Sequence, residues 1–97
     1  MFYVKIHDAG YRKIIAVCDM QLIGKNLTNG EIKLDVSERF YKGDLKNKDE
    51  LINILNSAES INVIGNEAVA LCVEIGLVDN ENILKFGDVS YALVVEG

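Results

Sequence analysis

The chain has 97 residues, of which 49% are hydrophobic, and a formal net charge of −5 at pH 7. This length fits a single domain, residues 1–97, whose core buries roughly two-thirds of the unfolded chain's surface without a metal or a disulfide. Its apolar runs are far shorter than the ~20 residues of a membrane-spanning helix, which excludes a spanning protein. The first residues alternate like a strand and lack the charged and then apolar order of a signal peptide, so we expect a cytoplasmic protein.

The two halves of the sequence have net charges of opposite sign. Residues 1–48 contain nine of the ten Lys and Arg residues and six acidic residues, which gives this half a charge of +3. Residues 49–97 contain one Lys and nine acidic residues, which gives −8. This asymmetry predicts one surface suited to an anionic partner and another that would repel it and instead suit a basic protein.

Short apolar patterns in the first half predict antiparallel strands. Residues 2–7 alternate apolar and polar side chains, as in a strand with one buried face. Residues 13–18 are apolar on both sides, as in a central strand that is covered on two faces. Residues 20–25 have no decisive period and fit a short connecting strand or a turn. Asn29-Gly30 then favours a turn before another alternating strand over residues 32–36.

The second half combines helical periods with short strands. Asn47 and Glu50 have the spacing of a capping box, and Asn66 is a good N-cap residue. The predicted elements are a helix over residues 48–58, a strand over 61–64, a helix from Asn66 to Gly76 and a strand over 89–95. A strand-helix-strand connection would make the last two strands parallel, with a right-handed crossover. We therefore expect an α/β fold of the mixed α+β kind: an N-terminal antiparallel β meander followed by a βαβ-like half, with two main helices packed on a mixed sheet.

The stretch 39–48 is both basic and aromatic. Four cations alternate there with Phe40 and Tyr41, a composition able to stack on unpaired bases and to neutralise phosphates. If Phe40 instead packs into the core, the lysines are only a solvated surface. The residues predicted to bind RNA are Lys25, Arg39, Tyr41, Lys42, Lys46 and Lys48.

The sequence gives weaker support for a metal, catalytic or phosphate-binding site. Cys18 and Cys72 lie among apolar neighbours and far apart, which indicates two buried thiols in a reducing compartment. One His and two unclustered Cys do not supply the usual four zinc ligands, so we expect no metal and no cofactor. His7, Cys18 and Asp19 would form a catalytic group only if adjacent strands brought them together, and a buried Cys18 has little thiolate character. Gly65-Asn66 lacks the glycines of a dinucleotide fingerprint, so it reads as an ordinary helix start rather than a phosphate site.

Five short stretches occur in an order and spacing that resemble one known family. They are Ala16-Val17-Cys18-Asp19, Leu22-Ile23-Gly24-Lys25, Phe40-Tyr41-Lys42-Gly43, Asn62-Val63-Ile64-Gly65-Asn66-Glu67 and Glu74-Ile75-Gly76-Leu77. Together they are similar to the archaeal domain of unknown function 424 family over nearly the whole chain. The resemblance directs attention to Cys18, Asp19, Gly24, Lys25, Phe40, Tyr41, Gly43, Asn62, Gly65 and Glu67.

The resemblance implies a small, stand-alone archaeal protein without an established reaction and with an association with translation or RNA. That association agrees with the basic stretch 39–48. The family pattern ends in a Gly-x-Pro-His-like segment, whereas this chain has Ser90-Tyr91 at the place of Pro-His. A role for that histidine therefore does not carry over to this chain.

Three functions remain open from the sequence. The favoured one is a non-enzymatic module that docks on RNA or a ribonucleoprotein, ribosomal RNA included. The second is a small-molecule-binding protein or an enzyme with a pocket near Cys18, Asp19, Asn62 and Glu67. The third is a homo-oligomer or protein-interaction adaptor whose interface would include Tyr3, Tyr11 or Tyr91.

Overall fold

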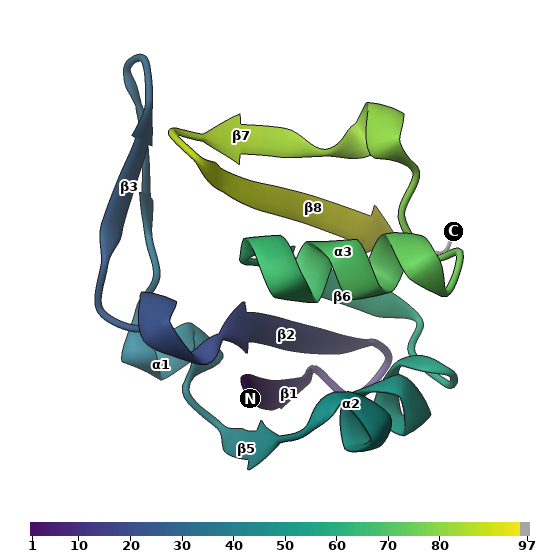
Figure 1. Cartoon of the computed structure of the whole chain (residues 1–97). Coiled ribbons are helices and arrows are strands. Elements are labelled where there is room, and N and C mark those ends of the chain that lie inside the picture. The colour runs from purple at the N-terminus through teal and green to yellow at the C-terminus, as the bar shows by residue number, and fades with distance from the viewer. Residues whose placement is uncertain (96–97) are drawn as a thin grey trace.

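The computed structural model describes residues 1–95, which form a mixed six-stranded sheet and a separate two-stranded hairpin (Figure 1). The strands are β1 (Phe2–Asp8), β2 (Lys13–Asp19), β3 (Asn26–Asn29), β4 (Ile32–Asp35), β5 (Asp44–Lys46), β6 (Ser60–Ile64), β7 (Leu84–Phe86) and β8 (Val89–Val95). The helices are α1 (Glu38–Tyr41), α2 (Lys48–Leu55) and α3 (Asn66–Glu74), with short 3-10 helices η1 (Met20–Leu22) and η2 (Asn80–Asn82). The expected mixed α+β class with two main helices is confirmed. Within the described residues, no helix is long and apolar enough to cross a membrane.

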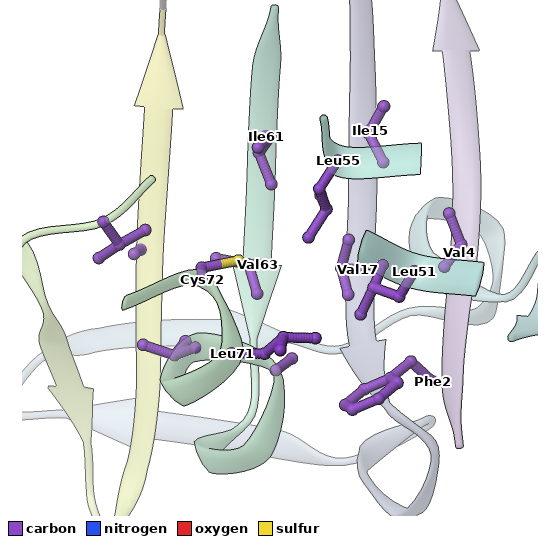
Figure 2. Packing of buried hydrophobic residues seen from close by; sticks show 14 residues of the cluster. Phe2, Val4, Ile15, Val17, Leu51, Leu55, Ile61, Val63, Leu71 and Cys72 are labelled. Carbon is purple, nitrogen blue, oxygen red and sulfur yellow. The ribbon is translucent and has the colours of Figure 1, made fainter. Parts of the chain in front are cut away.

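Helices α2 and α3 cover one face of the sheet. In Figure 1, α3 runs in front of β6, and α2 lies at the end of the sheet formed by β5 and β1. Figure 2 shows the core between these layers, where Leu51 of α2 lies near Val17 of β2 and Cys72 of α3 lies near Val63 of β6. Leu51 is fully buried, so its truncation to Ala would cost about 2–5 kcal/mol of stability.

The capping box predicted for α2 is present. The backbone N–H of Glu50 donates to the Asn47 side chain at 2.9 Å, and the backbone N–H of Asn47 donates to the Glu50 carboxylate at 3.0 Å. The helix ends at Leu55 rather than at residue 58. The next residues form tighter bonds, including Ala58 N–H to the Leu55 carbonyl at 3.1 Å, which turn the chain back into β6.

The predicted parallel pairing of the last two strands is wrong. Strand β8 pairs with β6 in the antiparallel sense, and the parallel neighbours in the sheet are β2 and β6. The reason is β7, a three-residue strand that the sequence interpretation missed. It follows α3, runs parallel to β6 and forms a hairpin with β8, which lies between the two. The βαβ-like unit is therefore β6-α3-β7, with β8 inserted into it.

The predicted strand near residues 32–36 exists as β4, but it does not continue the N-terminal meander. It pairs with β3 across the expected Asn29-Gly30 turn, and the two strands form a separate hairpin. The undecided residues 20–25 contain η1 and the turn that leads into β3. Figure 1 shows the hairpin rising from the main sheet beside β7.

The order of the strands divides the sheet into two halves that correspond to the two halves of the chain. The order is β5-β1-β2-β6-β8-β7, so one half of the sheet is built from residues 2–46 and the other from residues 60–95. The two charged halves of the sequence are not fully separated in space, because α2 packs on β1 and β5 and β3 contacts β7.

Candidate nucleic-acid interface

The short helix α1 packs on the sheet face opposite α2 and α3. The Ser37 side chain caps it by accepting a hydrogen bond from the Phe40 backbone N–H at 3.1 Å. Tyr41 then points into the sheet, among Ala16, Cys18 and Ile64. This second, smaller core holds α1 against β1 and β2.

Tyr41 is not available to stack on a base. Its side chain is only 2% exposed, and its hydroxyl donates to Oδ1 of Asn62 on β6 at 2.5 Å. Nδ2 of Asn62 donates in turn to the hydroxyl of Tyr91 on β8 at 3.2 Å. Burial raises the pKa of Tyr41. The prediction that Tyr41 contacts RNA is therefore wrong, because this residue links α1 to the two halves of the sheet.

Phe40 lies at the edge of α1, where it is half-buried against β1. Its ring stacks on His7 with the centroids 4.4 Å apart and the ring planes 18° apart. Nε2 of His7 donates to the Phe40 carbonyl at 2.8 Å, and Nζ of Lys5 donates to the Arg39 carbonyl at 2.5 Å. These contacts leave a hollow of about 370 Å³, lined by Lys5, His7, Ser37, Arg39 and Phe40.

Sequence interpretation missed Lys5, His7 and Ser37 as members of this site. Lys5 and His7 stand on the more polar side of the alternating strand, which was a usable signal for exposure. Their meeting with α1 depends on contacts between residues 33 or 34 positions apart, which no local pattern encodes.

The remaining predicted cations fall into two groups. Arg39 is exposed on α1 and Lys42 at its C-cap. Lys25 lies beside the start of α1, where the Lys25 carbonyl accepts the Val36 N–H at 2.9 Å. Lys46 lies opposite Phe2 in the β5–β1 pairing, which puts it on the face covered by α2. Lys48 approaches the Glu74 carboxylate at 3.7 Å.

Lys48 also has acidic surroundings. It lines a hollow of about 360 Å³ that contains both Glu67 and Glu74. We therefore separate Lys46 and Lys48 from the cations around α1, and define the α1 face as Lys5, Lys25, Arg39 and Lys42.

The four residues of the rival pocket lie on both faces of the sheet. Cys18 and Asn62 belong to the face that carries α1, since Asn62 bonds to Tyr41 and Cys18 packs against it. The Asp19 carboxylate instead points toward the first turn of α3, where Glu67 is exposed. Because the sheet separates the two pairs, these residues do not line a common pocket.

Asp19 supplies the N-terminal cap of α3. Its carboxylate accepts the backbone N–H groups of Glu67 at 3.0 Å and Ala68 at 2.9 Å, and its side chain is almost fully buried. Burial raises the pKa of Asp19, while these two hydrogen bonds act in the opposite direction. The predicted cap at Asn66 is wrong. Gly65 is the N-cap residue, and glycine has no side chain that could accept a hydrogen bond from the helix.

Asn66 has a different contact, with the turn between β7 and β8. Its Oδ1 accepts the Ser90 N–H at 2.8 Å, and its Nδ2 donates to the Asp88 carbonyl at 2.9 Å. The two residues that replace Pro-His in the family pattern are thus both used in the fold. Ser90 provides an N–H that a proline lacks, and Tyr91 accepts from Asn62.

The imagined catalytic group of His7, Cys18 and Asp19 does not assemble. In the β1–β2 register His7 is opposite Ile14, whereas Cys18 is opposite Tyr3, so His7 and Cys18 lie roughly 13 Å apart along the strands. Burial, and then the neighbouring Asp19 carboxylate, raise the pKa of Cys18 to about 12. Its thiol donates to the Asp19 carbonyl at 3.0 Å and stays protonated at neutral pH.

Both cysteines are free and buried, as expected, and burial raises the pKa of Cys72 to about 11. Within residues 1–95, no three His, Cys, Asp or Glu side chains are grouped so that they could hold a metal ion. Among the tyrosines considered for an oligomer interface, Tyr11 is 90% exposed, whereas Tyr3 and Tyr91 pack partly against the smaller core.

The fold and this face define a small mixed α+β domain with a cationic hollow between strand β1 and the short helix α1. The chain belongs to the family described as protein of unknown function (DUF424), whose model matches residues 7–96. It is also similar to an uncharacterised conserved protein from Methanopyrus kandleri, whose crystal structure aligns with a TM-score of 0.79 at 25% sequence identity. That alignment covers 99% of this chain and 93% of the other. A search of curated proteins gives no match.

Proposed function

We propose that this protein is a non-enzymatic cytoplasmic module that binds RNA or a ribonucleoprotein in translation through the α1 face. One observation carries the proposal: Lys5 and Arg39 line the same hollow, and none of its lining residues is acidic. An anionic polymer is attracted to such a positive surface, which orients its approach.

The α1 face has the chemistry that RNA backbones require. Lys5 and Arg39 meet at the hollow, and Lys42 extends the positive surface along α1. Glu38 is the acid of this helix, and its carboxylate lies 4.0 Å from the Lys42 ammonium on the exposed surface. Such an exposed pair contributes little energy and is screened by salt, so Lys42 stays available to a phosphate.

Fluorescence anisotropy with a labelled, unstructured RNA tests the proposal. With about three phosphate contacts, affinity for single-stranded RNA should fall about 20-fold between ~50 and ~200 mM salt. The double variant Arg39→Met, Lys42→Met should bind more weakly and have a salt slope smaller by about 1.4.

A matched double variant controls for the change in net charge. Lys48→Met, Lys85→Met also removes two positive charges, but Lys48 lies near Glu74 and Lys85 donates to Ser90 on β8, in the other half of the sheet. This variant should keep the affinity and salt slope of the wild type. Equal losses in both double variants would contradict the α1 face as the RNA surface, and no measurable RNA affinity in the wild type would end the proposal.

A further inference from the structure

We infer that the hollow between β1 and α1 binds one nucleotide of unpaired RNA, with its phosphate at Lys5 and Arg39 and its base against the Phe40–His7 ring pair. This inference rests on the proposed function and names the ligand of the same face. The hollow, of about 370 Å³, lies at the lower end of the ~300–1,000 Å³ typical of ligand sites, which suits one nucleotide rather than a helical segment.

The polar lining of the hollow is suited to an anion. It contains an ammonium, a guanidinium and a hydroxyl, and none of its five lining residues is acidic. Lys5 uses one N–H for the Arg39 carbonyl and keeps two for a ligand. The Ser37 oxygen accepts from the Phe40 N–H, so its own O–H remains free to donate.

Within the described residues, no carboxylate pairs with the charges at the hollow. Among residues 1–95, the salt bridges are Lys42 with Glu38 and Lys48 with Glu74, so neither Lys5 nor Arg39 has a carboxylate within 4.0 Å. Lys5 is also held in place, because it is half-buried and bonded to α1. A phosphate therefore meets a cation whose position is already ordered, which lowers the entropy cost of binding.

The aromatic wall distinguishes a nucleotide from a simple anion. His7 and Phe40 are stacked in parallel, and the Nε2 hydrogen bond to the Phe40 carbonyl holds the imidazole in that orientation. A further flat ring extends such a stack, and stacking of a base on an aromatic side chain is tolerant of sequence. Bases inside a duplex do not present their faces, so the site selects single strands.

The test uses uridine 5′-monophosphate, inorganic phosphate and a short oligouridylate, with binding followed by amide chemical shifts of the full-length protein. The nucleotide should shift the amides of residues 5–7 and 37–40. Lys5→Met, which keeps the apolar stem, should weaken nucleotide and oligouridylate binding about tenfold. Lys13→Met is the matched control, because it removes the same charge from β2 outside the hollow, and it should bind like the wild type.

A second variant separates stacking from charge. Phe40→Leu keeps an apolar side chain and should weaken the nucleotide about fivefold while leaving inorganic phosphate unchanged. Inorganic phosphate that binds as tightly as the nucleotide, or a duplex that binds more tightly than the single strand, would overturn the inference. Loss of RNA binding in Arg39→Met, Lys42→Met without any nucleotide-induced shift at the hollow would overturn it and leave the proposed function intact. Nucleotide binding without any affinity for RNA would refute the RNA function and, with it, the inference.

Discussion

Replacement of Gly65 by Ala tests how α3 is attached to the sheet. Gly65 has φ +119°, a conformation that side chains rarely adopt, and an added Cβ would meet the Asp19 carboxylate. That carboxylate carbon would lie 2.3 Å from the new methyl group, so Asp19 must move away from the two amides of α3 that it caps. Backbone strain costs about 1–3 kcal/mol, and the weakened hydrogen bonds to a charged group bring the total to about 3–5 kcal/mol.

Urea unfolding followed by circular dichroism gives this free energy directly. A domain of this size has a total stability of about 5–15 kcal/mol, so the midpoint of the variant should fall sharply, and its melting temperature should drop by about 12 °C or more. Gly76→Ala is the matched control, because Gly76 also has a positive φ, +82°, but nothing lies within 4 Å of its added Cβ. It should lose only about 1–2 kcal/mol. If the two variants lose the same stability, the contact between Gly65 and Asp19 does not hold α3 as argued.

Two further predictions concern buried polar groups. Burial raises the pKa of the Asp19 carboxyl above 3.8, so the folded state binds the carboxyl proton more tightly than the unfolded state does. The wild type should therefore lose stability relative to Asp19→Asn as the pH rises from 3.8 through the raised pKa. A wild-type urea midpoint that rises relative to that of Asp19→Asn with rising pH would contradict this direction. Tyr41→Phe should cost about 1–2 kcal/mol, because Oδ1 of Asn62 loses its donor, and should leave RNA affinity unchanged. Weaker RNA binding by a variant of unchanged stability would mean that Tyr41 reaches the surface.

Local contacts were predictable from the sequence, and distant ones were not. The capping box of α2 joins residues three positions apart, so Asn47 and Glu50 reveal it in the sequence. The cap of α3 comes from Asp19, 48 positions before the amide it accepts, and a nearby Asn offers a misleading local alternative. The direction of β8 depended on β7, whose three residues are too few to show an alternating pattern.

In the candidate site too, local features could be predicted from the sequence and tertiary packing could not. The sequence indicated that the basic aromatic stretch was important, and Arg39 and Phe40 do line the hollow. It gave no indication that Tyr41 turns inward, because neighbouring residues of a helix point to different sides and only packing decides which side is buried.

The residues that carry the family resemblance serve chiefly to hold the fold together. Asp19 and Gly65 form the start of α3, and Tyr41 and Asn62 join α1 to the sheet, all with buried or half-buried side chains or backbone. Their identity is explained by packing and hydrogen bonding without a ligand. Phe40 and Lys25 differ from these residues, because Phe40 lines the hollow beside two cations and Lys25 is exposed on the α1 face. Binding experiments therefore belong at the α1 face, since substitutions at the structural residues would change stability and affinity together.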